Sequence, residues 1–326
     1  MLPYKVIVTN KQLSGSGVSG EAEFEFLSLD DAKAYATSLT TAYSQVNVYI
    51  WDGTTVIPYE SSAPAFDADY QAVLDRSTTL GYTAPSAAQQ TLQNTLVTDL
   101  KTAGVWSKLD LFYVFATDGD SDYATLNWKA PSSFQATKVN SPTFTANEGF
   151  AQSGTAYLDS GYNLLTDGTN YTQDDAGVFG GFPTLSSTGQ TNNRPFGGDV
   201  GNYLSIRLDF DGASGGNRVW VNSTSFGVLP LFHKKDDSIF FANRTASNAI
   251  DTRSTHLSTS NTYTATYGIS STTLGYNENF IILKGRATDY FETTANIGVV
   301  ALGASLTTAE MEAVEEAWYT NYFTSL

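Results

Sequence analysis

The chain has 326 residues with no cysteine and two histidines, and its 17 basic against 33 acidic side chains give a formal net charge of −16. The lack of cysteine excludes a disulfide framework, a thiol nucleophile and a thiolate-ligated metal site, and two histidines are too few for a multi-histidine metal centre. The acidic surplus argues against DNA or RNA as a partner, because phosphate backbones are bound by clustered Lys and Arg.

The first sixty residues predict a small α+β module. Four segments have the alternation typical of strands, namely residues 4–9, 21–27, 45–51 and 54–59. Asp30 is placed to N-cap a helix between the second and third strands. Asp52-Gly53 favours a hairpin, since type I′ turns need positive φ. We therefore expect the order strand, strand, helix, hairpin over residues 1–60.

Two helices are expected next, over residues 61–108. The first covers residues 66–80 and ends at Gly81, a residue type favoured just beyond a helix C-terminus. Ser86 opens the second with the S-x-x-Q capping pattern. We assign this pair as a helical connector, with membership of the following domain as the alternative.

From residue 109 onward, short strands alternate with Gly, Asn, Asp and Ser clusters, which favours an antiparallel sandwich. The expected strands are residues 111–117, 123–128, 133–139, 155–161, 177–182, 203–210, 217–222, 238–244, 262–268, 279–285 and 296–303. Thr307 and Glu310 predict a capping box that opens a closing helix. Residues 109–326 are thus assigned to one β-sandwich domain with a C-terminal helix.

Several segments within about residues 86–326 carry a family resemblance: residues 104–116, 124–129, 140–144, 156–163, 289–291, 297–302 and 306–311. They resemble the concanavalin A-like (LamG-type) modules of tailed-bacteriophage and prophage proteins. The resemblance implies a mainly β fold, an antiparallel two-sheet jelly-roll sandwich, here preceded by the α+β module and the helical connector. It is weak for function, because this sandwich hosts lectins, glycosidases and structural modules alike.

A glycosidase on this fold needs two carboxylates across the scissile bond, and the Glu-x-Asp-x-x-Glu run of the family's hydrolases is missing. Three glutamates alternate on one N-terminal strand and are expected on a solvated face: Glu21, Glu23 and Glu25. In the sandwich, three more precede the terminal helix without a partner at suitable spacing: Glu148, Glu278 and Glu292. We expect no catalytic residue and no enzyme.

The run Asp118, Asp120 and Asp122 places three carboxylates at the spacing of calcium loops. Tyr123 stands where an EF-hand has Gly, and Lys129 where it has Glu. An acidic turn between strands explains the run equally well. Calcium here stays open, and no cofactor or metal ligand is assigned.

Neither histidine predicts a catalytic triad. Gly15-Ser16-Gly17 lacks the strand-to-helix architecture of a nucleophile elbow. We therefore expect His233 and His256 to be surface or rim residues. Lys234-Lys235 is followed by Asp236-Asp237, so it is a self-compensated loop and no basic patch.

Aromatic side chains could stack on sugar rings, but Tyr203, Trp220 and Tyr263 lie on predicted strands and are expected to pack in the core. Residues 192–199 (NNRPFGGD) read as a loop with donors, acceptors and one aromatic. Because loops on rigid scaffolds often carry binding groups, this segment is a conceivable ligand site.

These features favour a non-enzymatic bacteriophage virion protein displayed on the particle surface as a capsid decoration, head fibre or tail fibre component. The N-terminal module would dock to other virion proteins, and by analogy the chain would form homotrimers. The alternative is a glycan-binding module that engages host surface sugars; a polysaccharide hydrolase is less favoured. No secretory signal or membrane span is evident, so synthesis in the host cytoplasm is expected.

Overall fold

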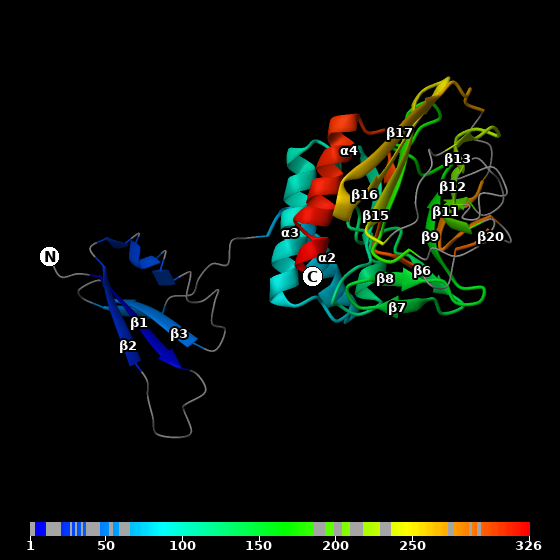
Figure 1. Cartoon of the computed structure of the whole chain (residues 1–326). Coiled ribbons are helices and arrows are strands. Elements are labelled where there is room, and N and C mark those ends of the chain that lie inside the picture. Colours follow the sequence, from blue (N-terminus) through cyan, green and yellow to red (C-terminus); the bar gives the residue numbers. More distant parts are fainter. Residues whose placement is uncertain are drawn as a thin grey trace. The chain divides into compact units, whose positions relative to one another are not determined.

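In the computed structural model, the described residues are 4–10, 21–26, 28–29, 31–33, 35–36, 46–51, 55–58, 66–185, 193–198, 204–208, 218–228, 236–272, 277–286, 289–291 and 295–326. By its contacts the chain divides into two compact units, residues 1–65 and 66–326, each with its own core (Figure 1). Residues 66–108 lie in the second unit, which is the alternative that the sequence left open for them. Among the described helices, none is long and apolar enough to cross a membrane.

The described part of the first unit forms an antiparallel sheet in the order β2-β1-β3-β4. Its strands are β1 (Tyr4–Asn10), β2 (Glu21–Phe26), β3 (Val46–Trp51) and β4 (Val56–Pro58). Val6 and Ile50, which face each other across β1 and β3, are buried with Ala32 and Ala36. The predicted cap Asp30 and turn Asp52-Gly53 lie outside the described residues.

The second unit begins with two helices, α2 (Ala68–Leu80) and α3 (Ala87–Thr102). The Asp67 carboxylate accepts from the backbone N–H of Asp69 and caps α2, and Gly81 ends it at φ 73°, a left-handed conformation that glycine adopts without strain. Ser86 caps α3 as predicted, by accepting from the N–H of Gln89.

Two antiparallel sheets follow within the described residues. The helix-facing sheet contains, in spatial order, β17 (Asn261–Tyr267), β16 (Ala249–His256), β15 (Ser238–Ala246), β10 (Ala176–Phe182), β22 (Val299–Gly303) and β5 (Leu109–Val114). The outer sheet contains β14 (Gly227–Val228), β13 (Arg218–Val221), β12 (Leu204–Leu208), β11 (Asn193–Gly198), β18 (Asn279–Ile282), β9 (Tyr157–Asn163) and β6 (Thr137–Val139). Short ladders join β19 (Lys284–Arg286) to β20 (Asp289–Tyr290), and β8 (Gly149–Ala151) to β7 (Thr143–Thr145) and β21 (Asn296–Ile297). The predicted mainly β, sandwich-like arrangement is confirmed.

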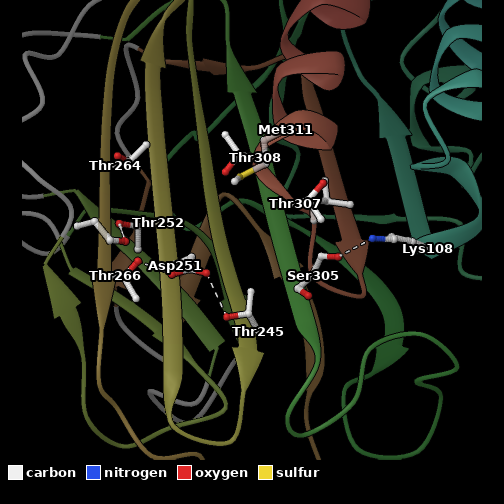
Figure 2. Close-up of a pocket in the computed structure, with 12 residues that line it drawn as sticks. Lys108, Thr245, Asp251, Thr252, Thr264, Thr266, Ser305, Thr307, Thr308 and Met311 are labelled. Atoms are coloured by element: carbon white, nitrogen blue, oxygen red, sulfur yellow. Dashed lines mark hydrogen bonds between the residues drawn. The ribbon is translucent and has the colours of Figure 1, made fainter.

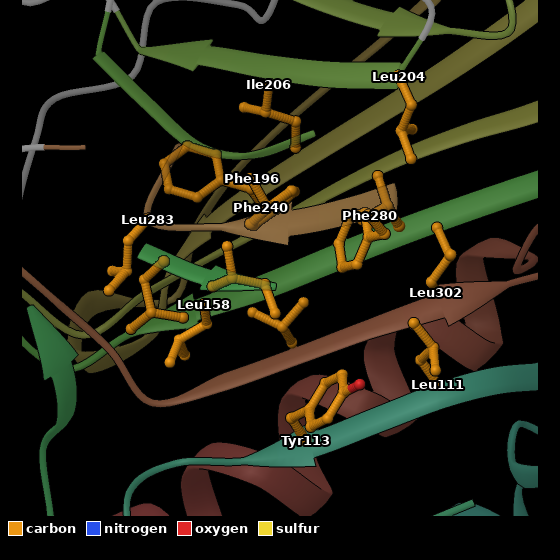
Figure 3. Close-up of a cluster of buried hydrophobic side chains, with 14 of the residues drawn as sticks. Leu111, Tyr113, Leu158, Phe196, Leu204, Ile206, Phe240, Phe280, Leu283 and Leu302 are labelled. Carbon is orange, nitrogen blue, oxygen red and sulfur yellow. The ribbon is translucent and has the colours of Figure 1, made fainter. Parts of the chain in front are cut away.

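Alternate residues of the two sheets meet in a buried core (Figure 3). The helix-facing sheet contributes Leu111, Tyr113 and Leu302, and the outer sheet contributes Phe196 and Phe280. The period of two follows from strand geometry, because successive side chains point to opposite faces.

A second core lies between the helix-facing sheet and the helices. Phe112 and Phe241 of the sheet belong to it, together with Leu100 of α3 and Trp318, which follows α4 (Thr308–Glu315). Strand β5 is therefore buried on both faces, which explains why its sequence is an almost continuous apolar run. The predicted capping box of Thr307 and Glu310 opens α4 with both hydrogen bonds present.

The buried amide of Gln93 ties the helical layer together. Its Oε1 accepts from the hydroxyls of Tyr70 and Tyr123, at 2.9 and 2.7 Å. Its Nε2 donates to Thr117 Oγ1 and to the hydroxyl of Tyr322 near the end of the chain, both at 3.1 Å. A buried amide with all these partners fixes helix α3 against the sheet and the C-terminal segment.

Candidate functional site

A groove opens where the beginning of α4 faces strands β15, β16 and β17 of the helix-facing sheet (Figure 2). Its volume is about 550 Å³. Seven of its twelve lining residues carry hydroxyl groups: Thr245, Thr252, Thr264, Thr266, Ser305, Thr307 and Thr308. We call this site the threonine groove.

Asp251 is held in the groove by hydroxyls from the two neighbouring strands. Its Oδ1 accepts from Thr266 on β17 at 2.6 Å, and its Oδ2 accepts from Thr245 on β15 at 3.1 Å. The register places Thr266 directly opposite Asp251. Because a carboxylate offers about four acceptor positions, this one is fixed in orientation and still able to accept further hydrogen bonds.

The opposite wall of the groove is the start of α4 and the segment that leads into it. Lys108 reaches it and pairs with Glu310 at 2.7 Å. Burial alone would raise the pKa of Glu310, but Lys108 and the N-cap Thr307 outweigh burial and lower it. The lysine charge is therefore neutralised within the protein. Leu306 and Met311, also on this wall, are buried and belong to the core between the sheet and the helices.

An ion pair holds α4 over the sheet and so sets the spacing of the two walls. Arg253 on β16 makes a two-pronged contact with Glu315, with N–O distances of 2.7 and 2.8 Å. Thr255 donates to the same carboxylate at 2.6 Å. A guanidinium that binds a carboxylate through two parallel hydrogen bonds fixes direction as well as distance.

The lining has the chemistry of a site for a neutral, hydroxyl-rich molecule. Hydroxyl side chains both donate and accept, and an ionised carboxylate accepts strong hydrogen bonds from pairs of hydroxyls. Among the lining residues that the structure describes, Asp251 is the sole carboxylate and none is aromatic. Recognition here would therefore rest on hydrogen bonds more than on ring stacking.

The acidic run at residues 118–122 is a structural turn in which each carboxylate has a protein partner. Asp118 accepts from the N–H of Ser86, and Asp122 pairs with Lys138 at 2.7 Å. Asp120 accepts from backbone N–H groups, including that of Thr83 at 2.6 Å. Within the described ranges, no three acidic or histidine side chains converge as a metal site.

The structure of this turn shows that one predicted strand is wrong. Residues 123–128 form no strand, because Tyr123–Thr125 is a turn of 3-10 helix. Asp120 Oδ1 accepts from the N–H groups of Asp122 and Tyr123 and so favours the helical turn over extended backbone.

The prediction of a ligand-binding loop at residues 192–199 is wrong for the residues that the structure describes there. Asn193–Gly198 is the fully buried strand β11. Phe196 points into the core between the sheets. Pro195 is tolerated because the register with β12 shifts between Asn193 and Phe196, and prolines are accommodated at such bulges.

The prediction of a surface or rim position is wrong for His256, which is buried and only 8% exposed. Its ring nitrogens contact the hydroxyls of Thr259 and Ser258, the latter at 3.1 Å. The Asp237 carboxylate also interacts electrostatically with His256, which partly offsets the rise of the pKa of Asp237. His233 lies outside the described residues.

The aromatic residues that were expected in the core differ in their burial. Trp220 is buried as predicted, but it lies against the guanidinium of Arg194, 4.8 Å from the ring centre, on the opposite side of β13 from the inter-sheet core. Tyr263 is half-buried on β17 and belongs to neither core of the second unit, so the core prediction is wrong for it. Tyr203 lies outside the described residues.

The glutamates singled out in the sequence do not converge in the described structure. Glu25 is exposed and pairs with Lys5 at 3.6 Å. Glu148 is exposed, whereas Glu278 is buried beside Gly198 on the outer sheet. Glu292 and the side chains of Glu21 and Glu23 lie outside the described structure.

No family model matches the chain, and no curated protein sequence matches it either. Among solved structures, it is similar to domain 4 of a GH43 extracellular arabinanase from Geobacillus stearothermophilus in complex with arabinotriose, with TM-score 0.40 and 12% identity over 64% of this chain and 98% of that one. Lectin II from Ulex europaeus gives TM-score 0.37 and 8% identity, over 61% of this chain and 100% of that one. The CBM2 module of Lactobacillus casei BL23 phage J-1 evolved Dit gives 0.33 and 9%, over 52% and 82%.

Proposed function

We propose that this chain is a non-catalytic glycan-binding protein and that the threonine groove holds the sugar. The observation that carries the proposal is Asp251, oriented by Thr245 and Thr266 on the floor of a groove lined mostly by hydroxyls. Two adjacent sugar hydroxyls can donate to the two carboxylate oxygens while threonine hydroxyls serve the neighbouring positions. Leu306 and Met311 lie buried behind this wall, so contact with the sugar would rest on the hydroxyl and carboxylate groups.

The charges of the lining favour a neutral glycan over an acidic one. Asp251 would repel a uronic or sialic carboxylate at close range. Lys108, the cation of the lining, is already paired with Glu310 and is not free to attract an anion.

Binding without hydrolysis is proposed because a glycosidase requires two carboxylates on either side of the bond. Asp251 has no second carboxylate beside it in the described lining. Glu310, on the α4 wall, is committed to Lys108 and to the helix cap. Release of reducing sugar from a bound polysaccharide would overturn this part of the proposal.

The test is a glycan array followed by calorimetry on the glycans that bind. Asp251→Asn and Thr266→Val should each weaken binding, the first by about tenfold or more, because it replaces charge-assisted hydrogen bonds with neutral ones. Thr91→Val, at an exposed position of α3 outside the groove lining, is the matched control and should bind as the unaltered chain does. The absence of binding on the array, or glycan binding that neither groove variant weakens, would contradict the proposal.

We further propose that the protein is displayed on a tailed-bacteriophage particle, with residues 1–65 attached to capsid or tail proteins and the sandwich outward. Two features support this: the sequence resemblance to concanavalin A-like phage modules, and a division of the chain into two compact units. Mass spectrometry of purified particles should find the chain. A chain absent from particles would leave glycan binding intact and remove the virion role.

A further inference from the structure

The open edges of the two large sheets differ in how they are protected from pairing with another chain. Strand β5 is covered, since Phe112 accepts from the N–H of Trp128 at 2.8 Å and donates to the side chain of Asn127. At the edges of the outer sheet, β14 has two residues, and β6 has three, including Lys138. Short strands and lysines are common protections of an edge.

Strand β17 has none of these protections. It runs for seven residues, Asn261–Tyr267, without a charge or a proline, and it pairs with β16 in an unbroken register. In the part of the chain that the structure describes, no backbone hydrogen bond from another strand reaches its free side. A long, regular and neutral edge is a template for pairing with a further strand.

The side chains of β17 are arranged to fit a second copy of the same strand. Three exposed threonines, Thr262, Thr264 and Thr266, alternate along one face. If two copies run antiparallel about a two-fold axis at Thr264, Thr264 faces its own copy and Thr262 faces Thr266. Directly opposed threonines are among the side-chain pairs that stabilise antiparallel strands.

We propose that β17 is the interface between two copies of this chain, paired antiparallel about a two-fold axis at Thr264, so that the two helix-facing sheets become one continuous sheet. The contact uses the same patch on both copies, as a two-fold interface requires. It also brings together neutral strands in a chain whose net charge is −16, so the paired strands themselves add no like-charge repulsion. This arrangement gives a dimer in place of the trimer expected by analogy from the sequence.

The full chain lacks cysteine, so a single introduced thiol reports the geometry directly. Thr264→Cys should form a disulfide-linked dimer on mild oxidation, because residues at a two-fold axis lie within disulfide reach. Thr91→Cys, exposed on α3, is the control and should stay uncrosslinked at the same concentration.

Light scattering tests the same contact without a crosslink. The unaltered chain should show twice the chain mass of 35.1 kDa, and Thr91→Lys should leave that mass unchanged. Thr264→Lys places two ammonium groups opposite each other at the axis and should give monomers. A monomeric or trimeric unaltered chain, a dimer indifferent to Thr264→Lys, or equal crosslinking of the two cysteine variants would each overturn the proposal.

Discussion

The ion pair between Arg253 and Glu315 offers the most direct test of what holds α4 over the sheet. The side chains of Arg253 and Glu315 are only 8% and 12% exposed. Hydrogen bonding to Glu315 is the largest cause that raises the pKa of Arg253, and Glu312 adds a longer contact of 3.4 Å. Thr255 donates to the Glu315 carboxylate from the strand side.

Replacing Arg253 by Met keeps most of the side-chain volume and removes the cation. Glu315 then remains largely buried, with the Thr255 hydroxyl as its described hydrogen-bond donor. Removing one partner of a buried pair costs about 3–5 kcal/mol. The remaining donor places Arg253→Met at the lower end, about 3 kcal/mol. For a domain of this size each kcal/mol lowers Tm by about 2–4 °C, so we expect a loss of about 6–12 °C.

Thermal unfolding followed by circular dichroism measures this loss. Arg253→Met combined with Glu315→Met should recover most of it, because removing both charges leaves no buried carboxylate uncompensated. Glu312→Gln is the matched control: that side chain is 59% exposed, and exposed pairs contribute about 1 kcal/mol or less. If Arg253→Met costs no more than Glu312→Gln, the ion pair of Arg253 and Glu315 does not hold α4 and the reasoning fails.

Three further substitutions test other parts of the second unit by chemical unfolding. Burial alone would raise the pKa of Asp120, but backbone N–H groups outweigh it and lower the pKa; Asp120→Asn should therefore destabilise at pH 7, and the difference should shrink as the pH falls through the pKa of the folded state. Burial, and then the charge of Asp236, raise the pKa of Asp237. Asp237→Asn should therefore stabilise the fold at pH 7, and this gain in stability should disappear below the ordinary pKa of about 3.9. A gain that does not change with pH would contradict this. Gln93→Leu removes the acceptor of two buried tyrosine hydroxyls and should lower the free energy of unfolding by about 2–4 kcal/mol. A loss below about 1 kcal/mol would show that the hydroxyls find other partners.

The sequence predicted well where one local cause decides the structure. The capping residues Ser86 and Thr307 and the terminator Gly81 act within one helical turn, and the structure has all three in those roles. Alternating residues also predicted most strands of the sandwich, because a half-buried sheet imposes a period of two.

The errors arose where a tertiary contact outweighs the local pattern. Residues 193–198 look like a loop because they contain Gly, Pro and Asn, yet Phe196 is needed in the inter-sheet core and a bulge accommodates Pro195. Residues 123–125 look like a strand, yet hydrogen bonds to Asp120 bend them into a helical turn.

The threonine groove could not be predicted, since its residues come from three separate segments of the chain: Lys108, residues 245–266 and residues 305–311. Lys108, Asp251 and Ser305 meet only because the sheet order places β15–β17 beside the segment that leads into α4. The one available signal was the alternation of Thr262, Thr264 and Thr266. It predicts a strand with a polar face, but not that α4 leaves this face open.

The groove and the proposed dimer edge are linked because strand β17 serves both. Its threonines at 264 and 266 line the groove, and its free edge is the proposed contact between copies. A two-fold axis perpendicular to the joined sheet keeps both copies on the same face, so both grooves would open toward the same side. A surface that presents repeated sugars could then engage two grooves at once, and the second binding event would be intramolecular. Weak hydrogen-bonded recognition at each groove would thereby give firm attachment without an aromatic platform.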